Sequence, residues 1–287
     1  MMLAGWERAN ELLRGAYDLH THSAPSLIPR EVDDVQLLRE ADAGGMAGVL
    51  IKSHFEPTQS RAALLNLYGG TVAQAYGAIA LNQAVGGLNP YAVENAARTG
   101  AKVIWLPTMD AQHAMSFGPT PFDRFERPGL TVFDENGDIN KATLAVLEVT
   151  RSFGLPVATG HLGPKEILSV CYVAKEMDVQ VVLTHPDWPR TVTPLDVQVE
   201  LAGSGVVVEK VAQNVETGCI TIERLVRDIR EIGAQNVILV TDRGQKNCIR
   251  PVESLRELII RLLDNGVSAE ELSLMLKRNP RRLLRLN

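Results

Sequence analysis

The fold depends on two patterns that meet in YDLHTH, residues 17–22. One is a short apolar strand, and the other is the set of polar residues at the end of that strand. Further short runs rich in Val, Ile and Leu follow it along the chain. Such runs are typical of parallel strands that are buried on both faces. We predict eight strands, at Tyr17–His22, Gly48–His54, Val72–Leu81, Val103–Pro107, Pro156–Gly160, Val181–His185, Val206–Lys210 and Val237–Asp242.

Segments with helical periodicity lie between these runs, and several end at a glycine such as Gly154 or Gly233. Because each helix returns the chain to the start of another parallel strand, eight repeats favour an α/β fold, the closed (β/α)8 TIM barrel. An open doubly wound sheet usually carries a glycine fingerprint after its first strand, and this sequence has none. The predicted helices are Glu31–Ala43, Lys141–Phe153, Lys165–Met177, Ile222–Ile232 and Ser254–Leu263.

The 287 residues fit one such barrel, so we expect a single domain over residues 1–287. A leading helix within residues 1–15 and a C-terminal helical cap, residues 266–287, lie outside the repeat. The longest irregular stretch, residues 109–139, follows the fourth strand and contains a predicted hairpin around Asn136 and Gly137. A loop of this length at this end of a barrel is typical of a lid.

The composition excludes several classes of protein. With 45% hydrophobic and 22% charged residues, the chain is neither disordered nor fibrous. The net charge of −5 provides no attraction to nucleic acid or to an anionic membrane. Charges interrupt the apolar N-terminal stretch, and three widely spaced cysteines argue against a disulfide framework. These features predict a cytoplasmic protein.

Five of the six histidines lie where a predicted strand ends. The carboxyl ends of all strands meet at one mouth of a barrel, where barrel enzymes keep their active sites. Alternate strand residues share a face, so His20 and His22 can reach one ion, and Asp242 adds a carboxylate from the eighth strand. Scattered core histidines would show no such preference. The five are His20, His22, His54, His161 and His185.

Imidazole and carboxylate groups are ligands of divalent metals, and Zn²⁺ is the first candidate here, with Mn, Fe and Ni as alternatives. The sequence leaves open whether one or two ions are bound. Ligands supplied by distant strands leave a coordination position for water, which is typical of catalytic sites.

In their order along the chain, these motifs resemble the metal-dependent amidohydrolase superfamily. The resemblance rests on YDLHTH (17–22), ATGHLG (158–163), VVLTHPD (181–187) and LVTDRG (239–244), and it covers residues 16–265. It implies that His20, His22 and Asp242 hold a first metal. It further implies that His161 and His185 hold a second metal, or share the first and position the substrate.

The chain departs from that family at the fourth strand, where VIWLPTMD (103–110) has no glutamate or lysine to bridge two metals. Lys52 on the second strand is either a carbamylated bridge, a cation for a substrate carboxylate, or a lysine that extends into solvent. His54 on the same strand also resembles the polymerase-and-histidinol-phosphatase phosphoesterases, although the third strand lacks the further ligands of that group.

Substrate binding is predicted for His54, Arg190 and Arg243, because a guanidinium can hold a carboxylate or phosphate through two N–H groups. Arg124 and Arg127 in the long loop are weaker candidates for the same role.

Two acidic residues lie close to the predicted ligands. Glu209, at the end of the seventh strand, is either another mouth residue or a partner of a ligand. Asp18 is expected to form hydrogen bonds behind His20.

The sequence therefore predicts metal-assisted hydrolysis of a small molecule, at the C–N or C–O bond of an amide, lactone or related ester. Asp242 would act as the general base, His185 or His161 would polarise the scissile carbonyl, and Lys52 or an arginine would hold a distal anion. The alternatives are a decarboxylase or other lyase, a phosphoesterase, and a ligand-binding barrel without catalysis. The expected partner is a small-molecule substrate. A homo-oligomer is left open, because the apolar face of Ser254–Leu263 suits either a dimer interface or packing against the barrel.

Overall fold

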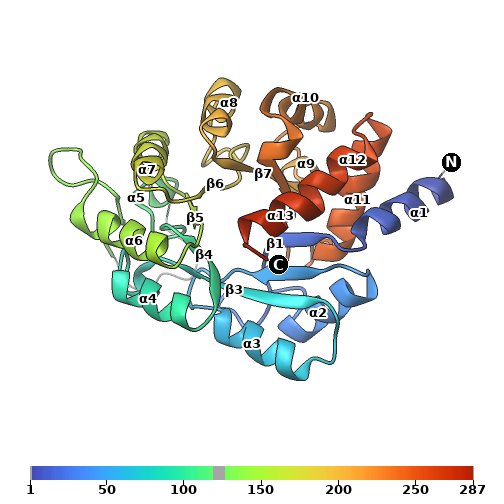
Figure 1. Cartoon of the computed structure of the whole chain (residues 1–287), viewed down its shortest axis with the longest axis horizontal. Helices are drawn as coiled ribbons and strands as arrows, with labels where there is room; N and C mark the ends of the chain where they lie inside the picture. Colours follow the sequence, from blue (N-terminus) through green and yellow to red (C-terminus); the bar gives the residue numbers. More distant parts are fainter. Residues whose placement is uncertain (1, 119–126, 287) are drawn as a thin grey trace.

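A computed structural model describes residues 2–118 and 127–286 and shows parallel strands surrounded by helices (Figure 1). Each strand pairs with the next one along the chain, in the order β1 to β8. The barrel closes between β1 and β8, because the Asp242 N–H donates to the His20 carbonyl and the His22 N–H donates to the Arg243 carbonyl, each over 2.8 Å. The predicted (β/α)8 TIM barrel is confirmed. Its strands are β1 (Tyr17–Thr21), β2 (Gly48–Ile51), β3 (Gln74–Ala80), β4 (Ala101–Trp105), β5 (Val157–Ala158), β6 (Val181–Leu183), β7 (Val207–Val211) and β8 (Val237–Val240).

Helices cover the outside of this barrel, while α1 (Met2–Leu13) and the N-terminus project at one side (Figure 1). The helices between strands are α2 (Asp34–Ala43), α3 (Gln59–Tyr68), α4 (Pro90–Arg98), α5 (Gln112–Met115), α6 (Lys141–Ser152), α7 (Pro164–Glu176), α8 (Leu195–Gly203), α9 (Ala212–Glu216) and α10 (Ile222–Ile232). After β8 come α11 (Pro251–Asp264), α12 (Ala269–Ser273), the π-helix η3 (Leu274–Arg278) and α13 (Asn279–Leu283). No helix of the described residues is both long and apolar enough to cross a membrane.

The strands are apolar on both faces because each face packs against a separate core. One core lies between strands and helices. The other fills the barrel and includes Leu19, Leu50 and Trp105, of which Trp105 is only 1% exposed. Leu283 and Leu284 at the end of α13 belong to this inner core, so the C-terminal segment closes one end of the barrel.

The five predicted helices are present as α2, α6, α7, α10 and α11, with ends shifted by a few residues. The sequence analysis did not predict α3, α4 or α8. The signal for α4 was nevertheless present, since Asn89 caps the helix and Pro90 occupies its first turn.

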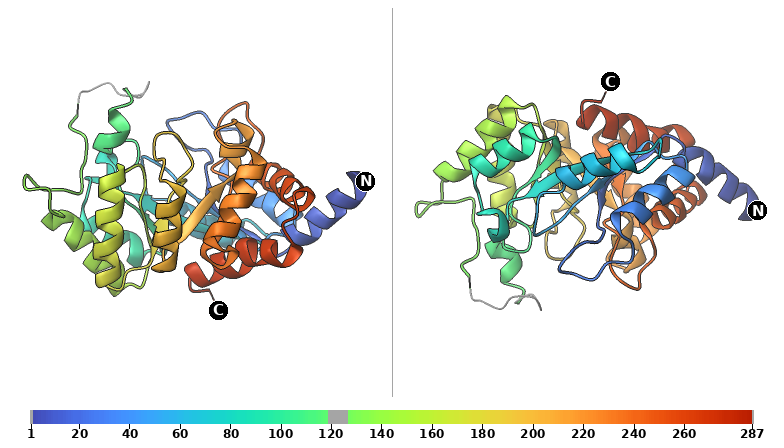
Figure 2. Two further views of the ribbon diagram at one scale, coloured as in Figure 1. Left: turned by 90° about the horizontal axis from the view of Figure 1, so that it is seen from above. Right: turned by 90° about the horizontal axis from the view of Figure 1, so that it is seen from below.

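The open mouth of the barrel lies opposite the C-terminal end, and α5 and the C-terminus lie on opposite faces in both views of Figure 2. The hairpin predicted around Gly137 is confirmed by an antiparallel bridge between Phe133 and Ile139. Arg124 lies outside the described residues.

Candidate metal centre

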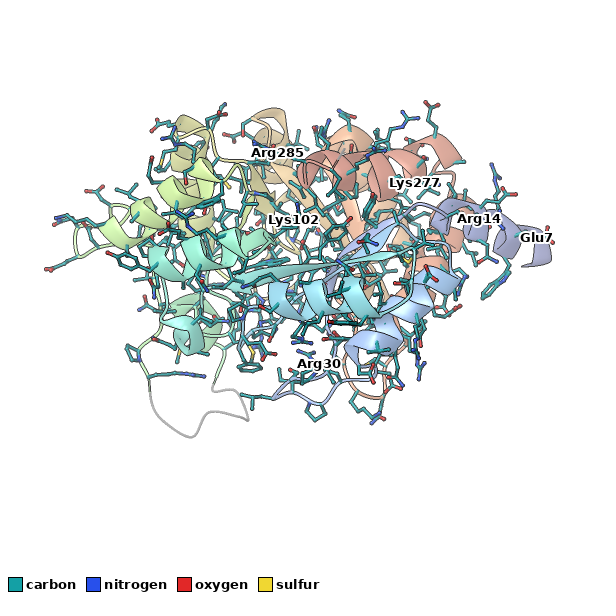
Figure 3. All side chains as sticks on the ribbon, turned by 60° about the horizontal axis from the view of Figure 1, so that its bottom comes forward. Glu7, Arg14, Arg30, Lys102, Lys277 and Arg285 are labelled. Carbon is teal, nitrogen blue, oxygen red and sulfur yellow. The ribbon has the colours of Figure 1, made fainter. Side chains whose placement is uncertain are left out.

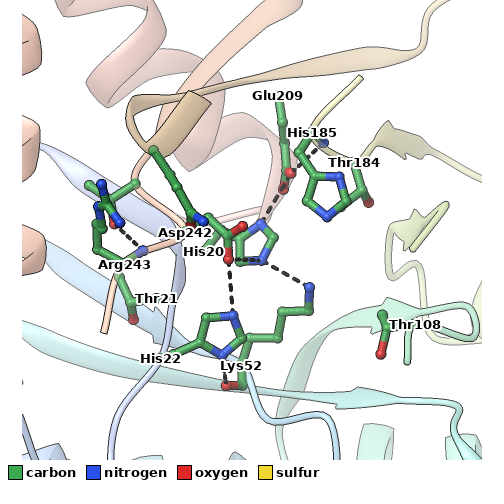
Figure 4. Close-up of polar contacts among 12 residues, drawn as sticks. His20, Thr21, His22, Lys52, Thr108, Thr184, His185, Glu209, Asp242 and Arg243 are labelled. Carbon is green, nitrogen blue, oxygen red and sulfur yellow. Dashed lines mark hydrogen bonds and ion pairs between the residues drawn. The ribbon is translucent and has the colours of Figure 1, made fainter. Parts of the chain in front are cut away.

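Three of the predicted ligands meet at the mouth. The side chains of His20, His22 and Asp242 each present a donor atom, and these atoms lie within 4.8 Å of one another (Figure 4). Oδ1 of Asp242 lies 3.1 Å from Nε2 of His20 and 3.0 Å from Nε2 of His22. The two imidazoles are almost completely buried, whereas the Asp242 side chain is 20% exposed. The cluster therefore opens to solvent on the carboxylate side.

The backbone holds this cluster by joining β1 to the segment after β8. The pairing of β1 with β2 shifts register between Asp18 and Thr21, an irregularity that lies at the histidine pair. Asp242 adopts a left-handed backbone conformation with φ of 53°, which non-glycine residues adopt only at some cost. A Cβ at Gly244 would lie 1.8 Å from the carbonyl oxygen of His22, so this close approach requires a glycine.

The hydrogen bonds of His22 determine where its lone pair lies. Nδ1 lies 2.9 Å from the carbonyl oxygen of Lys52, and a carbonyl only accepts, so Nδ1 carries the hydrogen. Burial, assisted by Arg30, lowers the pKa of His22 to about 3, so the ring is neutral and Nε2 has a free lone pair. Nε2 and the Asp242 carboxylate are then two acceptors at 3.0 Å. A cation between them satisfies both, and this donor set fits a divalent metal.

His20 is oriented by an acid from the opposite side of the barrel. Its Nδ1 lies 3.1 Å from Oε2 of Glu209, which also accepts the backbone N–H of His185 over 3.1 Å. Burial and Lys52 act to lower the pKa of His20, but Asp242 and Glu209 outweigh them and raise it to about 9. Glu209 is thus a partner of a predicted ligand, and it supports two of the histidines at once.

Asp18 also lies behind the cluster. Its carboxylate accepts the backbone N–H of His20 over 3.2 Å and that of Thr241 over 3.1 Å. It therefore connects β1 to the strand end that carries Asp242.

The imidazole groups of all five strand-end histidines lie next to one another in a closed circle, which we call the histidine ring. Neighbouring ring centroids are separated by 5.6, 5.1, 5.8, 5.0 and 5.9 Å around the circuit. The residues come from four different strand ends, so the predicted convergence is confirmed. Taken around the circuit, the ring is His20, His22, His54, His161 and His185.

His161 and His185 form the side of the histidine ring that faces Trp188. The indole centroid lies 5.3 Å from the ring of His161 and 5.2 Å from that of His185. The Thr191 hydroxyl donates to the His185 carbonyl over 3.0 Å, so it accepts the Nδ1 hydrogen of His185 over 2.9 Å. Burial lowers the pKa of His185 to about 4, and burial also holds the pKa of His161 well below its usual value. Nε2 of His185 therefore offers a lone pair, which suits a ligand and not a hydrogen-bond donor.

His54 has the opposite tautomer. The Thr108 hydroxyl accepts a hydrogen from Asn82 Nδ2 over 2.6 Å, and among the described residues Nδ1 of His54, at 2.9 Å, is the acceptor within reach of its own hydrogen. Nε2 of His54 then carries a hydrogen. His54 lines the cavity and can donate to a bound molecule there.

Lys52 lies inside the site. Its side chain is 2% exposed, with Nζ 2.9 Å from Nε2 of His20 and 5.1 Å from the centre of the Trp105 ring. These contacts exclude the alternative of a lysine that extends into solvent. Burial lowers the pKa of Lys52 to about 8, although Asp242 and Glu209 oppose the shift.

A cavity of about 230 Å³ lies above the cluster. Its wall contains His22, Lys52, His54, His161, His185 and Asp242, together with Trp188, Arg190 and residues of the loop after β4. Arg30 also lines it, and the sequence analysis did not single this residue out. A signal was available, because the loop after the first strand of a barrel lies at the mouth.

The other predicted arginines lie in different surroundings. The guanidinium of Arg190 stacks 5.4 Å from the Trp188 ring and 5.5 Å from the Phe117 ring at the cavity edge. Arg243 departs from the prediction, because its guanidinium binds Glu216 and it is absent from the cavity wall of the described residues. Arg127 pairs with Asp110 at 3.1 Å.

Comparisons with known proteins agree with this architecture. The model of a family of unknown function, DUF6282, matches residues 15–209. No curated protein matches the chain.

Solved structures match nearly the whole chain. An amidohydrolase from Pseudomonas aeruginosa is 13% identical with a TM-score of 0.67, and the match covers 96% of this chain and 98% of that one. A probable dipeptidase from the same organism is 13% identical, with a TM-score of 0.61 and coverage of 99% and 98%. A putative 2-pyrone-4,6-dicarboxylic acid hydrolase from Pseudomonas putida is 15% identical, with a TM-score of 0.59 and coverage of 95% and 98%. At these identities the likeness establishes the fold. The chain belongs to DUF6282, a family of unknown function, and its barrel is built like those of amidohydrolases.

Proposed function

We propose that this protein is a metal-dependent hydrolase that cleaves a C–N or C–O bond of a small molecule, such as an amide, a lactone or a related ester. The observation that carries the proposal is the cluster of His20, His22 and Asp242 at the base of a mouth cavity. Acceptor atoms that face one another at 3.0 Å require a cation, and the cavity places a small molecule beside it.

These three residues would hold the first ion, and His161 with His185 would complete the site or hold a second ion. Imidazole and carboxylate groups are the donors that Zn²⁺ prefers, and Mn, Fe and Ni accept the same set. When bound, such an ion lowers the pKa of water from 15.7 to about 7 and polarises a carbonyl oxygen.

Asp242 is the residue that moves the proton. Its carboxylate is the acidic group on the described cavity wall, and its side chain is 20% exposed. The free carboxylate oxygen would accept a proton from the attacking water and donate it to the leaving nitrogen or oxygen. Burial raises the pKa of Asp242, but His20 outweighs burial and keeps this pKa well below its usual range, so the carboxylate is ionised and can accept a proton.

The neighbouring residues would bind and orient the substrate. Nε2–H of His54 is directed to donate to a substrate oxygen, while Trp188 supplies an apolar wall that excludes water. Lys52 is close enough to the cluster to stabilise negative charge that develops near His20. The tautomer of His185 assigns it to ligand binding, so polarisation of the carbonyl is left to the other groups.

Metal content and chemistry can be tested together. The purified protein is analysed for metals, stripped with a chelator, reloaded with Zn²⁺, Mn²⁺, Fe²⁺ or Ni²⁺, and screened against amides, lactones and phosphoesters in water labelled with oxygen-18. We expect stoichiometric metal, activity that disappears on stripping, and one labelled oxygen in the product. Full turnover after exhaustive stripping would refute the proposal. Release of CO₂ without label would favour a decarboxylase, and phosphoester cleavage would favour a phosphoesterase.

A further inference from the structure

Arg30 is a cation on the cavity wall that no catalytic role above uses. It lies in the loop after β1 and lines the cavity together with His22 and Asp242. In Figure 3 it lies on the face of the molecule away from Lys277 and Arg285, which belong to the closed end of the barrel. Its guanidinium thus faces the same space as the metal cluster.

The backbone of Arg30 is held in place. Residue 30 forms an antiparallel bridge with Gln245, and the N–H of Glu31 donates to the carbonyl of Gly244 over 2.9 Å. The Glu31 carboxylate accepts the N–H of Asn247 over 2.9 Å. The loop after β1 is therefore fastened to the segment that follows Asp242, and the position of Arg30 relative to the cluster is set.

The guanidinium is only partly paired within the described residues. Its Nε is buried without a hydrogen bond. Its NH2 group lies 3.4 Å from Nδ1 of His22, but that nitrogen donates its own hydrogen to the Lys52 carbonyl and has no free lone pair. A guanidinium is always charged in proteins. Arg30 is half-buried, and its buried Nε–H is costly to leave unpaired unless a ligand accepts it.

The charge of the cavity favours an anion as that ligand. Arg30, Lys52 and Arg190 face it, whereas Asp242 is the acidic residue on its described wall. A divalent ion at the cluster would add further positive charge.

We propose that Arg30 binds a carboxylate of the substrate, which makes the substrate class small carboxylate-bearing molecules. The inference rests on the proposed hydrolase function and narrows it. The guanidinium offers parallel N–H groups that match the two oxygens of a planar carboxylate. A substrate anchored there holds its scissile bond towards Asp242, on the same wall of the cavity.

The test measures binding and not turnover. Glutarate, its neutral diamide and inorganic phosphate are titrated by calorimetry into the full-length protein, both stripped of metal and loaded with Zn²⁺. The variants are Arg30→Gln, Arg30→Lys, Arg190→Gln and the control Arg39→Gln, which removes an exposed arginine of α2. We expect glutarate to bind at least about tenfold more tightly than the diamide in the wild type and the control. The difference should vanish in Arg30→Gln and be partly kept in Arg30→Lys, with metal content unchanged.

Several outcomes would overturn the inference. These are equal binding of glutarate and diamide to the wild type, unchanged glutarate binding by Arg30→Gln, or loss of the preference only in Arg190→Gln. Binding of phosphate but not glutarate, dependent on Arg30, would replace the carboxylate with a phosphate. A failure of the hydrolase proposal looks different, because the Arg30-dependent preference would persist in a protein that retains no metal or hydrolyses nothing.

Discussion

Nε2 of His22 lies 3.0 Å from Oδ1 of Asp242, although neither atom carries a hydrogen. The contact is repulsive without a positive charge between the two atoms, and it is built by residues 220 positions apart in the chain. The folded protein therefore favours a cation at this point. The effect of removing His22 or Asp242 on cation binding can be measured.

Substitution of His22 with alanine should remove metal binding. The expected result is loss of stoichiometric Zn²⁺ from the purified protein, measured by elemental analysis. Zn²⁺ at 100 times its Kd should stabilise the wild type by about 2.7 kcal/mol and leave His22→Ala unchanged. His113→Ala is the matched control, because His113 contacts the Arg190 carbonyl, 2.7 Å away, and lies outside the cluster. Equal metal content in both variants would contradict the assignment.

Glu209→Gln should weaken metal binding without abolishing it. The carboxylate orients His20 and holds the backbone of His185, and loss of such a partner typically lowers metal affinity by about 10–100-fold. Competition with a chromophoric chelator measures the change. Glu200→Gln, which alters an exposed contact with Tyr172, should bind metal as the wild type does. An unchanged affinity in Glu209→Gln would show that the ring of His20 is held by its other contacts.

Lys210→Met should destabilise the fold. Lys210 is a fully buried residue of β7, and its Nζ lies 2.8 Å from Asp187 and 3.7 Å from Asp228. Removal of the ammonium leaves the buried Asp187 carboxylate without its ion-pair partner, at a cost of about 3–5 kcal/mol in the free energy of unfolding. Urea denaturation measures this cost. Lys246→Met removes an exposed ion pair with Glu31 and should change stability by less than about 1 kcal/mol, so similar values for the two variants would contradict the prediction.

Cys171 should resist alkylation at alkaline pH. The side chain is 2% exposed, and burial raises the pKa of its thiol from 9.0 to about 12. Because the folded pKa exceeds the unfolded value, this group contributes stability that is complete below pH 9 and is lost as the pH rises towards 12. Mass spectrometry after iodoacetamide treatment at pH 8.5 should show modified Cys248, which is exposed, and unmodified Cys171. Rapid modification of Cys171 in the native protein would show that this region opens.

The strands were predictable because both of their faces are buried. Runs such as Val237–Val240 are apolar at every position, and this signal does not depend on periodicity. The helix α3 was harder to predict, since it exposes Leu64, Leu67 and Tyr68 and so lacks a clear polar face. The second and sixth strands were predicted to end too late, because they were extended to the mouth residues His54 and His185, whereas β2 ends at Ile51 and β6 at Leu183.

The site residues were predictable where the position of a residue on its strand determines the direction of its side chain. His20, His22 and Asp242 follow from their places at strand ends, and they converge as expected. Arg243 was predicted on adjacency to Asp242, yet neighbouring residues point to opposite sides and Arg243 meets Glu216. The position of Arg30 after the first strand places its loop at the mouth, but the pairing of this loop with Gln245, which sets its position there, is revealed by no local pattern in the sequence.

The histidine ring constrains the order in which the site can assemble during folding. Its members and Asp242 come from both the first and the last strands, so a nascent chain that has not yet joined β8 to β1 has no complete set of donors. The complete donor set therefore exists only after β8 has joined β1, so it is a property of the closed barrel and of no smaller part of it.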